Sequence, residues 1–185
     1  MKSLDSIWDE YVDNDGLTPQ TVKDLAWHIK NDVDPGGAII MATDMRLKEL
    51  GSNIFCQLDN EDDYISEISI GCLLGGLRLA EYAEKGLQMA QESPYKNVRA
   101  SAIFSLGEVL DQIKDKKLKT KIARYIYYIL EGDDLELHES FSRGAYNSVL
   151  TAMEIPILER PRVRDLAENI DLNLVAEFKK KYGIK

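Results

Sequence analysis

The sequence predicts an all-α protein of about eight to ten helices that form antiparallel pairs through short loops. Apolar residues recur every three or four positions through most of the 185-residue chain, as they do along the buried side of a helix. No window alternates apolar and polar residues over the length of a strand. Glycine, proline and acidic clusters interrupt the apolar stripes, as expected of turns between helices.

The composition predicts one folded domain over residues 1–185. Hydrophobic residues make up 44% of the chain and charged residues 30%, which fits neither a disordered nor a membrane protein. The longest apolar runs, at residues 38–42 and 125–130, are far shorter than the roughly 18 residues that a membrane span needs. The acidic start of the chain is unlike a signal peptide, so we expect a cytoplasmic protein. We expect Cys56 and Cys72 to be small buried thiols.

Two helices are predicted in the first 31 residues. The first ends before the turn Asn14-Asp15-Gly16. Its apolar stripe consists of Leu4, Ile7, Trp8, Tyr11 and Val12. The second follows Thr18-Pro19. Its stripe consists of Val22, Leu25, Ala26 and Ile29. Trp8 falls in the buried stripe, whereas Trp27 is one place off its stripe and either packs against a neighbouring helix or faces a partner.

The next helices are separated by an acidic loop. Asp34 is the expected cap of the third helix, and Gly51-Ser52 is a candidate break in the less regular stripe that follows. That stripe consists of Ile40, Leu47, Leu50, Gly51, Ile54 and Leu58. After the acidic residues 59–63, helical spacing resumes over residues 65–72 until Gly75-Gly76 interrupts it.

Residues 79–113 carry the two clearest stripes. Small residues in the first of them permit a close approach between helices: Ala83, Gly86 and Ala90. The second stripe consists of Val98, Ala102, Leu106, Val109, Leu110 and Ile113. Ser93 offers an N-cap oxygen and Pro94 suits the first helical position, so the second helix is predicted to begin there. We expect this helix to be buried along one side.

This second helix resembles the second helix of a HEAT repeat. The family pattern is Asp-Pro, then Val-Arg, a small residue and Leu-Gly at fixed offsets. Those places are held here by Ser93-Pro94, Val98-Arg99, Ala102 and Leu106-Gly107, with Ser93 where the family usually has Asp. The resemblance covers residues 77–153 and implies a right-handed superhelix of antiparallel helix pairs, with a curved face for a partner. An irregular helical bundle would give the same stripes and is the alternative.

The last third of the chain continues the helical spacing. A stripe ends before Gly132 and consists of Ile122, Tyr125, Ile126, Ile129 and Leu130. Residues 133–136 read as a helix cap, and a further stripe runs from Phe141 to Ala152. Pro156 and Pro161 bracket a non-helical link, and residues 171–183 form a C-terminal capping helix. Ile65 aligns with Val98 and Val98 with Leu137 or Phe141, intervals that match a two-helix repeat of roughly 35 to 47 residues.

The net negative charge of the chain lies in its first half. Residues 1–92 hold 7 Lys and Arg against 18 Asp and Glu, a net charge of −11, whereas residues 93–185 hold 16 against 14, a net charge of +2. Such a field attracts basic partners, although acidity also serves solubility alone. The residues expected to steer a basic partner are Asp59, Glu61, Asp62, Asp63, Asp133, Asp134 and Glu136.

The sequence predicts no catalytic, cofactor or metal site. His28 and His138 are 110 positions apart and neither belongs to a spaced ligand motif. The glycine pairs at residues 36–37 and 75–76 lack the Lys-Ser/Thr of a phosphate-binding loop. Residues 59–63 lack the downstream glycine and glutamate of a calcium loop.

We therefore expect a non-enzymatic protein-binding module. By analogy with small acidic proteins, the most concrete version is an immunity protein that binds and neutralises a basic toxin such as a nuclease. The alternative is an enzyme of the HEAT-like class, a nucleic-acid repair glycosylase or lyase, for which lysines 114–121 and arginines 160–164 would supply the basic groups. The acidic half opposes wrapping by nucleic acid. A third hypothesis is a scaffold that associates with itself.

Overall fold

The computed structural model describes residues 1–131, 139–162, 165 and 169–185. Within these residues the backbone forms helices and no strand, so the predicted all-α class is confirmed. The helices are α1 (Leu4–Asn14), α2 (Pro19–Asn31), α3 (Gly36–Asp44), α4 (Gly51–Phe55), α5 (Asp63–Ile70), α6 (Ala83–Glu92), α7 (Lys96–Val109), α8 (Lys116–Glu131), α9 (Glu139–Ala152) and α10 (Leu172–Lys181). None of these helices is long and apolar enough to cross a membrane.

Short segments of tighter or wider helix join several of these elements. The segments of 3₁₀-helix are η1 (Lys48–Leu50), η3 (Ala80–Tyr82), η4 (Leu110–Gln112) and η5 (Ile157–Glu159). A π-helical segment, η2 (Gly71–Gly76), continues α5 and ends at the glycine pair that the sequence marked as an interruption. The link between Pro156 and Pro161, which the sequence predicts to be non-helical, contains one 3₁₀ turn at η5.

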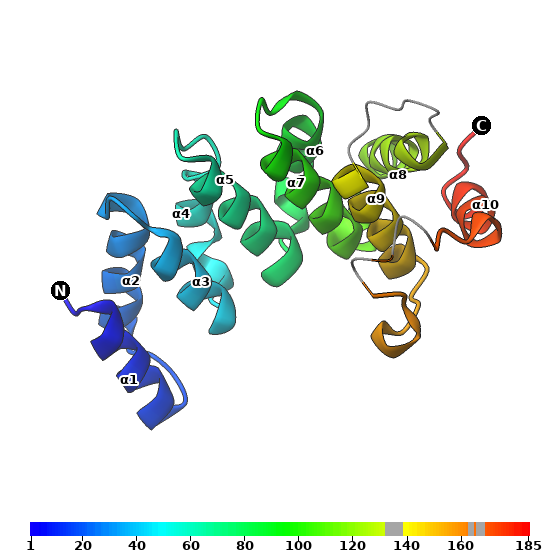
Figure 1. Ribbon diagram of the computed structural model, residues 1–185. Coiled ribbons are helices and arrows are strands. Elements are labelled where there is room, and N and C mark those ends of the chain that lie inside the picture. The colour runs from blue at the N-terminus through cyan, green and yellow to red at the C-terminus, as the bar shows by residue number, and fades with distance from the viewer. Residues whose placement is uncertain (132–138, 163–164, 166–168) are drawn as a thin grey trace.

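The helices lie in a row from the N-terminal end to the C-terminal end (Figure 1). Along the centre of this row α3 packs on α5, α5 on α7 and α7 on α9. A second helix accompanies each of these: α2 packs on α3, α4 on α5, α6 on α7 and α8 on α9. The core consequently runs as a band between the central helices and their companions, and α1 and α10 lie at opposite ends of it.

The stripe on α7 is buried as predicted, because Val98, Ala102, Leu106 and Val109 have no exposed surface. The predicted start of this helix is wrong. The N-cap is Tyr95, without a side-chain bond to the helix, and Pro94 lies in the link. Ser93 ends α6 instead, since its N–H donates to the Met89 carbonyl.

Small residues bring α7 and α9 into backbone contact. A Cβ added at Gly107 would lie 2.4 Å from Ser148 Cα, and one at Gly144 would lie 3.2 Å from the Ala100 carbonyl oxygen. The Ser148 hydroxyl donates to the Ile103 carbonyl at 2.7 Å. This hydrogen bond joins the two helices where the side chains are too small to separate them.

Three expectations about burial are wrong at particular residues. Trp8 is 42% exposed because α1 lies at the end of the row and packs mainly on α2 and α3, and Ile7 is the residue of its stripe that is fully buried. Cys56 is exposed and Cys72 is half-buried. For Trp27 the sequence leaves packing and exposure open, and the structure shows the side chain exposed, with its ring edge-on to His28 at 5.5 Å between centroids.

Two further boundaries differ from the sequence expectation. The chain between residues 38 and 58 breaks at Arg46, which has a φ of 56°, rather than at Gly51-Ser52. At Gly51 the 3₁₀ turn η1 passes directly into α4 without a loop. The C-terminal helix predicted over residues 171–183 is present as α10, with the Asp171 carboxylate as its N-cap.

Candidate functional site

The first predicted acidic cluster lies in the connection between α4 and α5. Asp59 is exposed, and its carboxylate binds the Lys85 ammonium of α6 at 2.8 and 3.1 Å. Asp62 is the N-cap of α5, because its carboxylate accepts the Tyr64 N–H at 2.9 Å. Glu61 is exposed beside them, and Asp63 is half-buried in the first turn of α5.

The structure therefore gives these four acidic residues different roles. Asp62 stabilises a helix terminus, and Asp59 fastens the connection to α6, so both carboxylates already have a partner within the chain. Glu61 projects from the connection with an exposed side chain. The second predicted cluster, Asp133, Asp134 and Glu136, lies outside the described residues.

Two adjoining pockets extend from Asp59 along α6. The first has a volume of about 320 Å³ and lies between the α4–α5 connection and the α6–α7 link. The second has a volume of about 640 Å³ and reaches from α4 to α8. Both are lined by Lys85, Gln88 and Glu92, so they adjoin along α6, and together they are called here the α6 groove.

Aromatic side chains form part of the wall of the α6 groove. The rings of Phe55 and Tyr82 stack with their centroids 5.0 Å apart and an interplanar angle of 26°. Tyr95 lies at the other end of the groove with an exposed ring. Partial burial raises the pKa of the Tyr82 hydroxyl, and the nearby Glu81 charge adds to the effect. Exposed ring faces of this kind attract guanidinium and ammonium groups.

The groove has an excess of negative charge. Its acidic lining residues are Asp59, Glu81, Glu84 and Glu92. Its basic lining residues are Lys85 and Lys121, which leaves a formal charge of −2. Carboxylates next to aromatic faces can hold the charged ends of Lys and Arg side chains while the rings cover their aliphatic stems.

Sequence reasoning identified only Asp59 among the residues of this groove. Glu81, Glu84 and Glu92 are spread over η3 and α6, so they form no run of acidic residues of the kind on which the sequence prediction depends. The available signal was their spacing, since residues 81, 84, 88 and 92 recur every three or four positions on the side of α6 away from its buried stripe.

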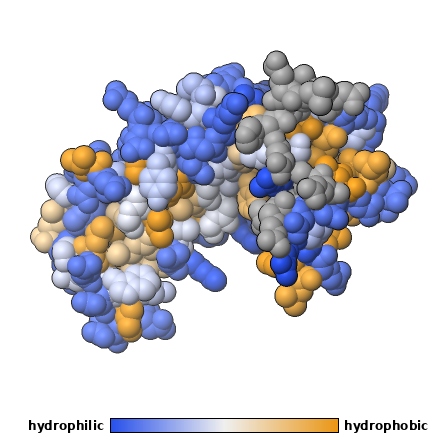
Figure 2. All heavy atoms as spheres, viewed as in Figure 1, coloured by the Kyte–Doolittle hydropathy of each residue, from blue (hydrophilic) through white to orange (hydrophobic). Residues whose placement is uncertain are grey.

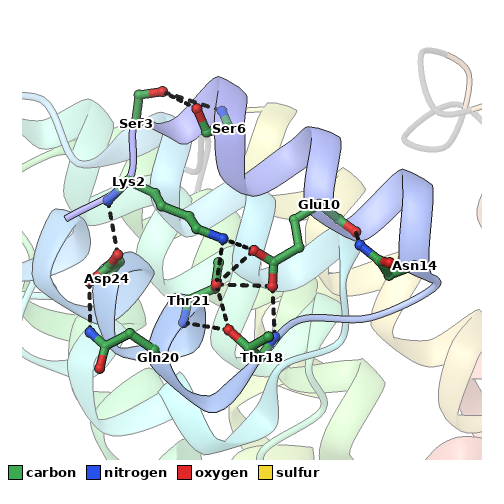
Figure 3. A network of polar contacts seen from close by, with 9 residues as sticks. All are labelled: Lys2, Ser3, Ser6, Glu10, Asn14, Thr18, Gln20, Thr21 and Asp24. Atoms are coloured by element: carbon green, nitrogen blue, oxygen red, sulfur yellow. Dashed lines mark hydrogen bonds and ion pairs between the residues drawn. The ribbon is translucent and has the colours of Figure 1, made fainter.

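A separate polar network fastens α1 to α2 (Figure 3). The Lys2 ammonium binds Glu10 and lies 3.2 Å from the Thr21 hydroxyl. Glu10 also accepts the Thr18 N–H at 2.8 Å and the Thr21 hydroxyl. Hydrogen bonds from Lys2, Thr18 and Thr21 lower the pKa of Glu10 to about 2. The Lys2 N–H donates to Asp24 at 2.9 Å, so the network is internally satisfied and we interpret it as structural.

His28 extends this network. Its Nδ1 lies 2.8 Å from an Asp32 carboxylate oxygen, and its Nε2 lies 2.8 Å from the Lys2 carbonyl oxygen. Desolvation lowers the pKa of His28, but the hydrogen bonds to Lys2 and Asp32 outweigh it and the pKa is raised. His138 lies outside the described residues. Among the residues that are described, no three metal-ligating side chains lie together.

The basic clusters expected for the nucleic-acid alternative are partly engaged. Arg160 donates to the Ile155 carbonyl at 2.8 Å and to the Thr151 hydroxyl at 3.0 Å, which ties the link after α9 to that helix. Lys119 donates to the Asp111 carbonyl at 3.0 Å.

Comparisons with protein-family models, with curated proteins and with solved structures found no match for this chain. The α6 groove is therefore the main basis for a functional proposal.

Proposed function

We propose that this chain is a non-enzymatic protein-binding module for a basic protein, most concretely a cytoplasmic immunity protein that neutralises a basic toxin such as a nuclease. The α6 groove carries the proposal, because it combines four carboxylates with the stacked rings of Phe55 and Tyr82. Lys and Arg side chains of a partner satisfy both features at once.

The charge of the whole N-terminal half supports the same partner. A net charge of −11 over residues 1–92 attracts a basic protein before contact and raises the association rate. The loop that carries Glu61 adjoins the groove through Asp59. On the face drawn in Figure 2, hydrophilic residues predominate along the upper edge, where Figure 1 places the α4–α5 connection.

We further propose that the row of helices is a HEAT-like right-handed superhelix of antiparallel pairs. The packing of α6 on α7 and of α8 on α9 supports this, as does the Leu106-Gly107 pair at the close approach of α7 to α9. Stacked helix pairs bury a common core and leave surface free for a partner. In this arrangement the α6 groove lies on the row of companion helices.

The test compares wild-type protein with Glu84→Lys, which reverses one charge in the groove. The control is Glu177→Lys, an equal reversal at an exposed position of α10. Each immobilised protein is exposed to host lysate, and the proteins retained are identified and purified. We expect wild type and the control to retain the same basic protein, and Glu84→Lys to retain much less of it.

Neutralisation is then measured directly. Adding wild-type protein should inhibit the nuclease or other toxic activity of the purified partner, with an association rate that falls steeply as salt is added. Equal retention by Glu84→Lys and the control would refute the role of the groove. Retention of wild type on duplex DNA at moderate salt, without a protein partner, would instead favour the repair alternative.

A further inference from the structure

A basic pocket lies in the acidic half of the molecule, at the C-terminal ends of α3 and η2. It has a volume of about 410 Å³ and is lined by Arg46, Lys48, Arg78 and the backbone turn Gly75–Leu77. Three of the seven Lys and Arg residues in positions 1–92 therefore line one pocket. None of its lining residues is acidic.

Two of these cations occupy the same place in a repeated unit. The hexapeptide Met-Arg-Leu-Lys-Glu-Leu at residues 45–50 recurs as Leu-Arg-Leu-Ala-Glu-Tyr at residues 77–82. Each copy follows a central helix and leads into a 3₁₀ turn, η1 or η3. The arginines have φ values of 56° and 55°, and the leucine after each donates its N–H to a carbonyl in the preceding helix at 2.9 Å.

A left-handed arginine is an unfavourable choice for such a turn. Glycine adopts this conformation without a steric cost, and Gly183, with a φ of 62°, holds the equivalent turn after α10. Glu154, with a φ of 59°, holds the equivalent turn after α9, so the turn alone does not require a positive charge. Packing does not explain Arg46, because its side chain is exposed and has no hydrogen-bond or ion-pair partner among the described residues.

Close packing places the two turns side by side. A Cβ added at Gly76 would lie 2.3 Å from the Thr43 side chain, so η2 touches the last turn of α3. Arg46 and Arg78 follow this contact by three and two residues respectively. The glycine thus allows two separate copies of the hexapeptide to line one pocket.

The charges around the pocket define what it can hold. Arg78 binds Glu108 of α7 at 3.0 Å, which offsets one of the three positive charges. Arg46 and Lys48 have no such partner in the part of the chain that the structure describes, so a formal charge of +2 remains. A phosphate monoester carries a charge of about −1.5 to −2 at neutral pH and matches the planar donors of arginine. The volume lies within the range of about 300–1,000 Å³ that is usual for small-ligand sites.

We propose that Arg46, Lys48 and Arg78 form a binding site for the phosphate group of a small phosphorylated molecule. Arg46 and Arg78 contact the phosphate oxygens from the two turns, and Lys48 supplies the second of the two uncompensated positive charges. This site is separate from the α6 groove, which is lined by different residues. Its existence does not depend on the identity of the basic partner.

Calorimetric titration with defined probes tests the proposal. Ribose 5-phosphate and inorganic phosphate should both bind to wild type, and ribose should not. Arg46→Gln and Lys48→Gln should each weaken binding of ribose 5-phosphate by about tenfold or more, since each removes a charge-assisted contact. Arg124→Gln, which removes an exposed cation from α8, is the matched control and should leave binding unchanged.

A second variant separates binding from folding. Arg46→Gly removes the side chain and relieves the left-handed backbone, so we expect a higher melting temperature together with loss of phosphate binding. Absence of binding of either phosphate probe to wild type would overturn the proposal, as would unchanged binding in Arg46→Gln and Arg46→Gly. A short DNA duplex that bound through Arg46 more tightly than ribose 5-phosphate would overturn the assignment to a small molecule.

Discussion

Replacing Gly107 by alanine tests the packing of the two central helices. The new Cβ would lie 2.4 Å from Ser148 Cα and 2.7 Å from Ser148 Oγ, far inside ordinary contact distance. Because the first of these atoms belongs to the backbone, no side-chain rotation relieves the clash. Helix α9 must move away from α7, which weakens the Ser148 hydrogen bond to Ile103.

The expected cost combines three contributions. Overpacking of a tight interior contact costs about 1–3 kcal/mol. Weakening a buried hydrogen bond costs about 1 kcal/mol more. Alanine in place of glycine within a helix returns about 0.5–1 kcal/mol. The net destabilisation of Gly107→Ala is therefore about 2 kcal/mol.

Urea denaturation followed by circular dichroism measures this difference. The matched control is Gly37→Ala in α3, where the added Cβ would meet only the Leu4 side chain at an ordinary 3.7 Å. We expect the control to be as stable as wild type or slightly more stable. If Gly107→Ala is no less stable than Gly37→Ala, the backbone contact between α7 and α9 is refuted.

Three further predictions follow from single residues. Leu106→Asp should prevent folding, because it places an unpaired charge in the core, and loss of the helical circular dichroism signal would show it. Asp62→Ala should lower the free energy of unfolding by about 1 kcal/mol through loss of the α5 cap, whereas wild-type stability in urea would contradict the capping role. His28 has a raised pKa, so its contribution is complete below its unfolded pKa of about 6.5 and is lost as pH rises through the folded value. His28→Gln should therefore destabilise the protein more at pH 5 than at pH 8, and an equal loss at both pH values would exclude the interaction of the charged imidazole with Asp32.

The sequence predicted most of the helices because their apolar residues face a band of neighbours on one side. Val98, Ala102 and Leu106 follow this rule on α7 and are fully buried. Trp8 does not, since α1 is a terminal helix with few neighbours and periodicity does not indicate how many helices lie beside it. The start of α7 was misplaced because α6 extends to Glu92 and uses Ser93 as its own C-cap.

The candidate sites were harder to predict because they depend on positions distant in the sequence. Asp59 was expected to bind a partner, and it pairs with Lys85, which is 26 residues away. Asp62 looked like an equivalent surface charge, but its place directly before the first turn of α5 makes it a cap. Runs of like charge in the sequence thus contained residues with different roles in the structure.

Arg46 and Arg78 belong to a short repeat rather than to a known motif. Arginine tolerates most exposed positions, so neither residue stands out alone. Their recurrence 32 residues apart, within the same pattern of apolar neighbours, indicates two copies of one helix-ending turn. Glycine is favoured in such a turn, but Glu154 holds the same turn after α9 with a φ of 59°, so the backbone conformation alone does not account for the two arginines. The contact between Gly76 and Thr43 joins the two turns and brings both arginines to one pocket without an acidic lining residue, which distinguishes it from an incidental cluster of surface cations.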